Sequence, residues 1–421
     1  MPHNPSQAGS GIRQPALFVL ASLMVVVLLC GCGGGDNVDK LVKSEMSRGK
    51  IPAATVVVLQ AGKIVKIGAY GLADMELAVP ATSDTVFRLQ SVSKQFTAAG
   101  VMMLVEEGKI GLDEPVSRYL DRCPESWRKM TVRHLLTQTS GLADFINEPI
   151  IDLKKDASEE DLLASIASRP LKFPPGDAWE YSNSNYLLAG ILIHRVSGLW
   201  HGDFLAARIF KPLGMTRTSV PRTRESLSDR AKGYTLVNGR ALPSAADTNL
   251  ALSVLSYGGG GVQSTVVDMA KWDAALSTEQ LLKKSTWAQV WAPVKLNNGN
   301  LHPYGLGWQL DDIAQHRRVW HAGNRTGFAA QIDRFVDDQL SVIVLTSLAG
   351  ARTARISRAI AGTFIPALAV PVYKPIKDRE PAVKERLLRG LAADEGRGAP
   401  PGGIYRPGVG LYFITCRPNE T

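Results

Sequence analysis

The sequence predicts an α+β fold in which one antiparallel sheet, built from both chain ends, is flanked by helices and carries a mostly helical inserted subdomain. Three observations support this prediction. Strand-like runs near the start of the chain return only after residue 317. Residues 110–300 mix helical patterns with loops rich in Gly and Pro. A short helix at 36–46 and an apolar helix at 356–368 can cover the sheet.

The N-terminal 31 residues have the pattern of a signal peptide. Arg13 supplies the positive charge, and residues 16–29 form an apolar run that is too short to cross a bilayer comfortably. The Leu-Cys-Gly-Cys stretch at 29–32 resembles the lipobox of bacterial lipoproteins. That resemblance implies cleavage before Cys32 and lipidation of Cys32. We therefore expect a membrane anchor in the bacterial cell envelope, facing the periplasm, and the glycine after Cys32 favours the outer membrane. A plain signal peptide with a chance cysteine is the alternative.

Composition predicts where the folded domain begins and ends. Residues 32–36 form a Gly-rich linker, and residues 37–370 have the apolar content of one large domain. The segment 371–421 is rich in Lys, Arg, Glu, Pro and Gly and lacks apolar periodicity, so we expect a tail of low order.

Local patterns predict the elements of the domain in chain order. Runs of β-branched residues at 55–60 and 64–70, joined by Ala61-Gly62-Lys63, indicate a hairpin. Residues 84–107 begin as a turn and continue with apolar residues at helical spacing until Gly108. The remaining expected elements are helices at 186–194 and 204–210, a loop at 256–261, and strands at 319–321, 328–335 and 340–347.

Charge and cysteine usage exclude several function classes. The formal net charge is +9, but Lys and Arg are scattered and no basic run is interleaved with aromatic residues, so nucleic acid is not an expected partner. The four cysteines contain no paired motif with metal-ligand spacing, and we expect no metal and no cofactor. Cys123 and Cys416 could pair in an oxidising compartment.

Ser91 and Lys94 form the first candidate catalytic pair. Residues three apart on a helix share a face, so the hydroxyl and the amine point the same way. A serine is a weak nucleophile until a base takes its proton, and a lysine can be that base when burial destabilises its ammonium. The start of a helix also offers backbone N–H groups to a developing oxyanion. Ser91 could instead serve only as a helix cap.

Two further motifs carry residues that suit the same chemistry. Tyr181 and Asn183 stand two residues apart, where a phenol can move protons and an amide can hold the lysine and a substrate carbonyl. His321-Ala322-Gly323 lies on a predicted strand and is followed by Asn324. The glycine lets a substrate lie against the strand edge, and the strand offers a backbone N–H. Each motif also has an alternative without a catalytic role. Tyr181 and Asn183 could be a buried tyrosine and a turn asparagine, and His321 could be a surface histidine with its hydrogen bonds made.

Together the three motifs match the three motifs of penicillin-binding enzymes. These are a Ser-x-x-Lys sequence, a second motif that ends in Asn, and a third motif that ends in Gly on a strand late in the chain. The chain resembles the class C β-lactamase-like serine hydrolases, which include esterases, D-aminopeptidases and D-alanyl-D-alanine carboxypeptidases. Further segments that resemble the family are 84–87, 135–142, 259–265 and 304–308, and the resemblance spans residues 37–368.

The resemblance implies a role for each matching position. Ser91 would form the acyl-enzyme, and Lys94 and Tyr181 would together act as general base and general acid. Asn183 would orient Lys94 and the substrate. The remaining positions bind substrate: the backbone N–H groups of Ser91 and Asn324 would form the oxyanion hole, and His321 and Gly323 would line the strand.

One departure from the family bears on the substrate. His-Ala-Gly at 321–323 replaces the Lys-Thr-Gly of β-lactamases, so the cation that receives a β-lactam carboxylate is missing. We therefore expect a serine hydrolase of esters or amides, such as short acyl esters or D-amino-acid peptides. A β-lactamase or a D-alanyl-D-alanine carboxypeptidase is the alternative within the enzyme class. A lipid-anchored envelope protein that binds but does not cleave its ligand is the alternative outside it.

Overall fold

The computed structural model describes residues 33–222, 230–245, 250–256 and 258–369. The predicted signal peptide, the lipidation site Cys32 and the predicted tail lie outside the described residues. The helices are α1 (Gly33–Gly49), α2 (Lys94–Glu106), α3 (Val132–Leu136), α4 (Glu159–Ala167), α5 (Asn183–Ser197), α6 (His201–Leu205), α8 (Leu252–Leu255), α9 (Val266–Ala275), α10 (Lys284–Val290) and α11 (Thr353–Phe364). Shorter helical turns are η1 (Gln90–Ser93), η2 (Val116–Arg118), η3 (Glu125–Trp127), the π-helical η4 (Ala206–Phe210) and η6 (Pro366–Leu368).

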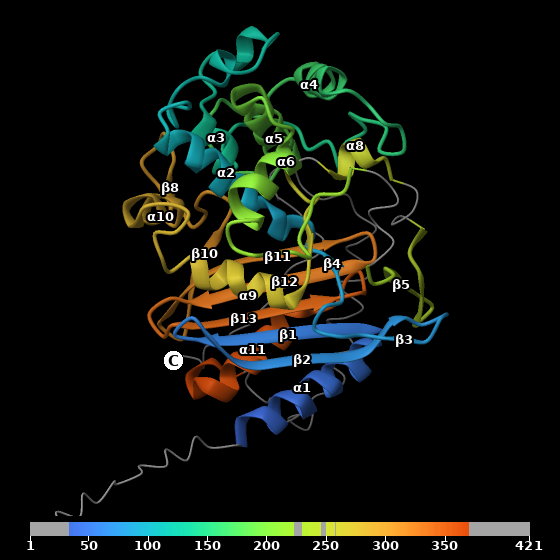
Figure 1. Ribbon diagram of the computed structural model, residues 1–421. Coiled ribbons are helices and arrows are strands. Elements are labelled where there is room, and N and C mark those ends of the chain that lie inside the picture. The colour runs from blue at the N-terminus through green and yellow to red at the C-terminus, as the bar shows by residue number, and fades with distance from the viewer. Residues whose placement is uncertain (1–32, 223–229, 246–249, 257, 370–421) are drawn as a thin grey trace, which may run out of the picture. The chain divides into compact units, whose positions relative to one another are not determined.

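One seven-stranded antiparallel sheet joins the two ends of the domain, as the sequence predicts (Figure 1). Its order is β10-β11-β12-β13-β1-β2-β3, so the first and last strands of the chain lie at its centre. The strands are β1 (Ala53–Gln60), β2 (Lys63–Asp74), β3 (Val79–Pro80), β10 (Gln309–Ile313), β11 (His316–Arg325), β12 (Phe328–Phe335) and β13 (Leu340–Thr346). The remaining strands form two-stranded pairs: β4 (Phe87–Arg88) with β7 (Gln263–Ser264), β5 (Tyr234–Val237) with β6 (Arg240–Pro243), and β8 (Val294–Lys295) with β9 (Leu301–His302).

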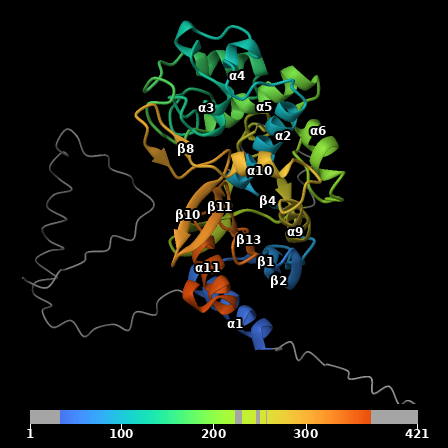
Figure 2. The ribbon, with the colours of Figure 1, turned by 90° about the vertical axis from the view of Figure 1, so that its left-hand side faces the viewer.

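Both faces of the sheet are covered, which explains why the central strands are continuous apolar runs. Alternate residues of β1 enter different cores: Val56 and Val58 pack with α1 and α11, while Val57 and Leu59 pack with the helical region. Figure 2 shows α1 and α11 on one side of the sheet and the helical region on the other. The terminal helices therefore have the position that the sequence predicts.

The structure differs from the sequence predictions in several elements, including α1, β10 and the β5–β6 hairpin. Helix α1 begins at Gly33 rather than residue 36, so the glycines of the predicted linker form its first turn; buried Val38 and Val42 anchor the helix more strongly than glycine weakens it. Strand β10 and the β5–β6 hairpin were not predicted. Their sequences are short and half exposed, so they show no apolar run.

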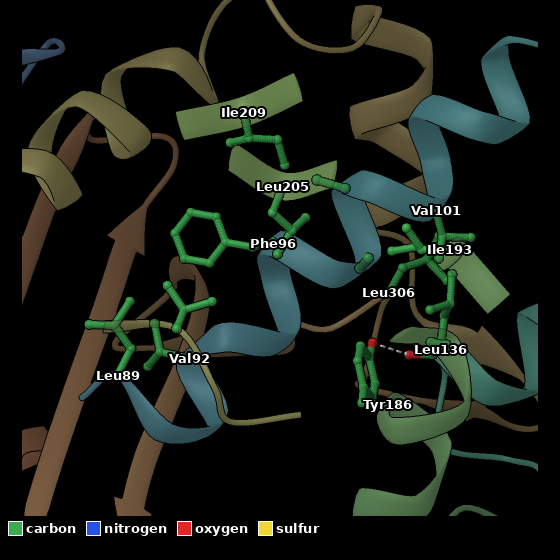
Figure 3. Packing of buried hydrophobic residues seen from close by; sticks show 14 of the residues in the cluster. Leu89, Val92, Phe96, Val101, Leu136, Tyr186, Ile193, Leu205, Ile209 and Leu306 are labelled. Carbon is green, nitrogen blue, oxygen red and sulfur yellow. Dashed lines mark hydrogen bonds between the residues drawn. The ribbon is translucent and has the colours of Figure 1, made fainter. Parts of the chain in front are cut away.

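Helix α2 is the centre of the larger core. Figure 3 shows Phe96 and Val101 of α2 among apolar side chains of α5, α6 and the η4 turn, namely Ile193, Leu205 and Ile209. The hydroxyl of Tyr186 in this core donates to the carbonyl of Leu136 at 2.7 Å. This packing fixes the position of α2, and the predicted nucleophile Ser91 lies in the η1 turn directly before it.

Two further findings concern the expectations about membranes and cysteines. None of the described helices combines the length and the hydropathy that a bilayer-spanning helix requires. Within the described residues Cys123 is a free thiol, and burial raises its pKa to about 11. Cys416, its possible partner, lies outside them.

Candidate active site

Ser91 lies in the η1 turn and Lys94 opens α2, one turn further along the chain. The Lys94 side chain is fully buried, and its Nζ lies 3.2 Å from the Ser91 Oγ. The same Nζ donates to the Asn183 Oδ1 and to the Gly259 carbonyl, both at 2.9 Å. The predicted pair Ser91 and Lys94 therefore lies next to Asn183 of the second predicted motif. The Gly259 carbonyl is a further hydrogen-bond partner of the Lys94 amine.

Burial gives Lys94 the properties of a base. Desolvation lowers the pKa of Lys94 to about 7, although the negative charge of Asp144 acts in the opposite direction and raises this pKa. An uncharged amine has two N–H groups and one lone pair. Because the Asn183 amide oxygen and the Gly259 carbonyl can only accept, they take the two N–H groups, and the lone pair faces the Ser91 hydroxyl.

Tyr181 is close to both the nucleophile and Lys94. Its hydroxyl is hydrogen bonded to the Ser91 side chain, and its ring lies 4.8 Å from the Lys94 Nζ. Burial raises the pKa of Tyr181, so the phenol stays protonated at neutral pH. A neutral amine and a neutral phenol thus flank one hydroxyl, and either can exchange a proton with it.

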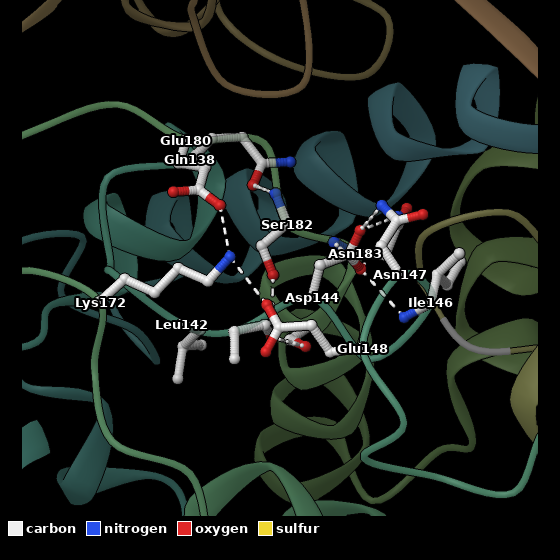
Figure 4. Close-up of polar contacts among 12 residues, drawn as sticks. Gln138, Leu142, Asp144, Ile146, Asn147, Glu148, Lys172, Glu180, Ser182 and Asn183 are labelled. Carbon is white, nitrogen blue, oxygen red and sulfur yellow. Dashed lines mark hydrogen bonds and ion pairs between the residues drawn. The ribbon is translucent and has the colours of Figure 1, made fainter. Parts of the chain in front are cut away.

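Asp144 orients the amide of Asn183 (Figure 4). The carboxylate accepts from the Asn183 backbone N–H at 3.1 Å and from its Nδ2 at 3.2 Å. Because a carboxylate only accepts hydrogen bonds, it holds the NH₂ end of the amide and turns the Oδ1 toward Lys94. Asp144 is buried and also accepts from the Ile146 backbone N–H and the Asn147 side chain. Sequence reasoning missed this residue.

Gln138 supports the same loop from the other side. Its Oε1 accepts from the Ser182 backbone N–H at 3.0 Å and from the Asn185 Nδ2 at 2.6 Å. Figure 4 also shows Lys172 joining Glu148 and Glu180 in ion pairs of 2.7 and 2.6 Å. Gln138 lies within the family-like segment 135–142 and Asp144 follows it closely, which is the signal that could have identified both.

Gly323 lets strand β11 pack directly against the nucleophile turn. A Cβ at this position would lie 2.2 Å from the Leu89 carbonyl oxygen and 2.9 Å from the Ser91 backbone nitrogen. No side chain fits at those distances. The sequence prediction placed a substrate against this glycine, whereas the structure places the turn that carries Ser91 there.

Two residues with strained backbone angles connect this turn to the tip of the β11–β12 hairpin. Gln90, directly before the nucleophile, has a φ of 52°, and Thr326, at the hairpin tip, has a φ of 45°. Few residues other than glycine adopt this left-handed region. The Gln90 Nε2 donates to the Thr326 Oγ1 at 2.9 Å, so each strained residue helps to hold the other.

The register of β11 directs the backbone N–H of Asn324 toward the site. Arg325 pairs with Phe328 across a two-residue turn and so forms a hydrogen-bonded pair with β12. Asn324 directly precedes Arg325 in the strand, so its backbone N–H points to the opposite edge. Strand β10 pairs with β11 only as far as Trp320, which leaves that edge without a strand partner in the described part of the chain. This position suits an oxyanion donor.

His321 is buried and uncharged. It is 1% exposed, its Nδ1 lies 2.8 Å from the Ala322 carbonyl, and its Nε2 lies 3.4 Å from the Tyr304 hydroxyl. Desolvation and the nearby Lys94 lower the pKa of His321 to about 3. The histidine packs behind Tyr181, with ring centroids 6.3 Å apart, and is not among the residues that line the cavity described next.

A cavity of about 450 Å³ opens in front of the nucleophile. The predicted residues that line it are Ser91, Tyr181, Asn183 and Asn324. The other lining residues are Gln90, Phe145, Ile146, Asn147, Leu153, Leu250, Gly259, Gly260 and Arg325. The cavity is large enough for a small acyl compound, and Phe145, Ile146, Leu153 and Leu250 give it an apolar part. Among the described residues, no group of His, Cys, Asp and Glu is arranged to hold a metal ion.

Comparisons with known proteins agree with this geometry. The family model described as Beta-lactamase matches residues 38–363. Penicillin-binding protein 4* of Bacillus subtilis (strain 168) is 32% identical over 70% of this chain and 67% of its own length. Protein flp of Staphylococcus aureus (strain N315) is 26% identical over 74% of this chain. The chain spans 63% of the length of that relative.

A solved structure has the same fold over nearly its whole length. The D-amino acid amidase of Ochrobactrum anthropi SV3 superposes with a TM-score of 0.66 at 25% identity. The match covers 79% of this chain and 97% of the amidase chain.

Proposed function

Because the chain belongs to the beta-lactamase family of serine hydrolases, we propose that it hydrolyses short acyl esters or amides through an acyl-enzyme on Ser91. The observation that carries this proposal is the position of the Lys94 amine, whose Nζ lies 3.2 Å from the Ser91 Oγ and whose pKa is lowered by burial to about 7. The D-amino acid amidase among the relatives supports amides of D-amino acids as a possible substrate class.

In the proposed acylation step, Ser91 Oγ attacks the carbonyl carbon while its proton passes to Lys94. The carbonyl oxygen becomes an oxyanion that accepts from the backbone N–H groups of Ser91 and Asn324. The bond to the leaving group then breaks, and the leaving oxygen or nitrogen takes up the proton, delivered from Lys94 through Tyr181. The products of this step are the acyl-enzyme ester and the free alcohol or amine.

Deacylation repeats the same proton transfers with water as the nucleophile. Water adds to the ester carbonyl while its proton passes to Lys94, directly or relayed through the Tyr181 hydroxyl, and a proton returns from Lys94 to Ser91 Oγ as the ester bond breaks. The carboxylic acid leaves and the free serine is restored. Asn183 and Asp144 hold the lysine in position through both steps.

The neutral state of His321 supports esters or amides over cephalosporins. A β-lactam presents a carboxylate close to the bond that is broken, and a buried imidazole with a pKa of about 3 cannot supply a cation to it. We expect a higher kcat/KM for nitrophenyl butyrate than for a chromogenic cephalosporin. Faster turnover of the cephalosporin would overturn this preference.

The test of the function is a Ser91→Ala variant treated with a fluorophosphonate probe and with nitrophenyl butyrate. We expect the wild type to form a covalent adduct and to turn over the ester, and the variant to lose both by at least a thousandfold. Ser126→Ala is a matched control, because this exposed serine has the same spacing to a lysine. Equal turnover by wild type and the Ser91 variant would contradict the proposal. A folded wild type without an adduct would favour the binding-protein alternative.

We further propose that the protein is anchored in the cell envelope by a lipid on Cys32. The support is the sequence pattern at 29–32. A Cys32→Ser variant expressed at full length is expected to lose labelling by a fatty-acid probe and to leave the membrane fraction. Cys123→Ser serves as the control, and equal labelling of both variants would refute the anchor.

A further inference from the structure

Arg325 lines the cavity and is the arginine of β11 that forms no ion pair with the described residues. The other arginines of β11 and β12 form ion pairs with aspartates: Arg317 with Asp337, Arg318 with Asp311, and Arg334 with Asp273. For Arg325 the structure records no ion pair and no side-chain hydrogen bond among the described residues. Its guanidinium is half-buried, and burial lowers its pKa, but an arginine remains protonated under such conditions. A desolvated, unpaired cation strongly favours an incoming anion.

The strand geometry places this charge on the face that serves the site. Residues at alternate positions of a strand share a face, so His321, Gly323 and Arg325 point the same way. Gly323 contacts the nucleophile turn, and His321 is uncharged. Arg325 is therefore the cation that this face presents to the cavity.

The position of the proton donor decides which part of the substrate reaches Arg325. Tyr181 packs next to His321, at one end of this strand segment, and its hydroxyl must face the leaving group. The acyl group then extends to the other end, where Arg325 lines the cavity with Phe145 and Ile146. The charge of Asp144 attracts the guanidinium toward the same region.

We propose that Arg325 binds an anionic group at the far end of the acyl chain, so that the preferred substrates join a short apolar chain to a terminal carboxylate. This inference rests on the proposed acyl-enzyme function and specifies its substrate class. Phe145 and Ile146 would contact the methylene groups, and the Arg325 guanidinium would form a charge-assisted pair with the carboxylate.

The test compares two nitrophenyl esters with six-carbon acyl chains, the adipate monoester and the hexanoate. The wild type is expected to have the higher kcat/KM for the adipate ester. In Arg325→Gln the ratio of the two kcat/KM values should fall by about tenfold to a hundredfold, the range for losing a hydrogen bond to a charged group. Arg325→Lys should keep part of the preference. Arg317→Gln, an exposed arginine of the same strand, should keep the wild-type ratio.

Each contrary outcome identifies the step that fails. A wild type that prefers the hexanoate, or an Arg325→Gln variant with an unchanged ratio, overturns the anionic subsite while Ser91-dependent hydrolysis still supports the proposed function. Should Arg325→Gln fail to fold, the Arg325→Lys variant decides: a smaller adipate preference with full hexanoate activity supports the subsite, and an unchanged ratio overturns it. Hydrolysis that does not depend on Ser91 overturns both proposals.

Discussion

Replacing Asp144 with asparagine tests how the site sets the protonation of its base. The carboxylate of Asp144 raises the pKa of Lys94, opposing the burial that lowers it to about 7. The two groups are joined through the Asn183 amide by hydrogen bonds of 2.9 and 3.2 Å. Their charges are therefore about 7 Å apart, and an effective dielectric constant of roughly 20 to 80 gives about 0.6 to 2.4 kcal/mol of stabilisation of the ammonium.

Loss of this attraction favours the uncharged amine, so the pKa of Lys94 should fall in Asp144→Asn by about one unit, at about 1.4 kcal/mol per unit. Asparagine retains an oxygen that can accept from the Asn183 Nδ2. Catalysis needs the unprotonated lysine, so the kcat/KM for nitrophenyl butyrate should rise with pH through about 7 in the wild type and through about 6 in the variant.

The assay is a pH profile of kcat/KM between about pH 5 and 9. Asp113→Asn removes an equal charge from an exposed ion pair with Arg133 and should leave the midpoint where the wild type has it. A midpoint that stays in place or moves upward in Asp144→Asn would refute the reasoning, as would a wild-type profile that is flat around neutral pH.

Three other substitutions address the remaining parts of the site. Tyr181→Phe removes the phenol beside Ser91 and should lower kcat by about a hundredfold or more, measured by single-turnover acylation with the probe ester. His321→Asn should leave the midpoint of the pH profile near 7, because a histidine with a pKa of about 3 does not titrate there; a displaced midpoint would assign it to the histidine instead. Gly323→Ala places a methyl group 2.2 Å from the Leu89 carbonyl oxygen, so kcat/KM should fall by at least about a hundredfold and thermal denaturation should show a loss of about 1 to 3 kcal/mol; full activity would contradict the close packing.

Local patterns of the sequence were enough to predict the parts of the fold that depend on neighbouring residues. The hairpin with strands at 55–60 and 64–70, and the helix that follows Ser91, were predicted because their patterns repeat within a few residues; in the structure the hairpin extends over 53–74. The spacing of three residues likewise predicted that Ser91 and Lys94 lie on one face of a helix. The return of strands after residue 317 was enough to predict a sheet built from both ends, which the strand order confirms.

The same locality explains which elements and side chains the sequence left out. Strand β10 forms because its backbone pairs with the edge of β11. The sequence of residues 309–313 contains no pattern that predicts this pairing. Asp144 and Gln138 act on a loop about 40 residues away, so their roles depend on a contact that no spacing rule encodes.

The sequence by itself determined the reactive pair and the family to which it belongs. Only the tertiary structure decided the electrostatics around that pair. A lysine becomes a base, and a histidine stays neutral, through the amount of water that packing removes. Likewise, Arg325 differs from Arg317 and Arg318 of its strand because it forms no ion pair within the described part of the chain. Distances between residues far apart in the chain are set when the sheet and the helical region come together.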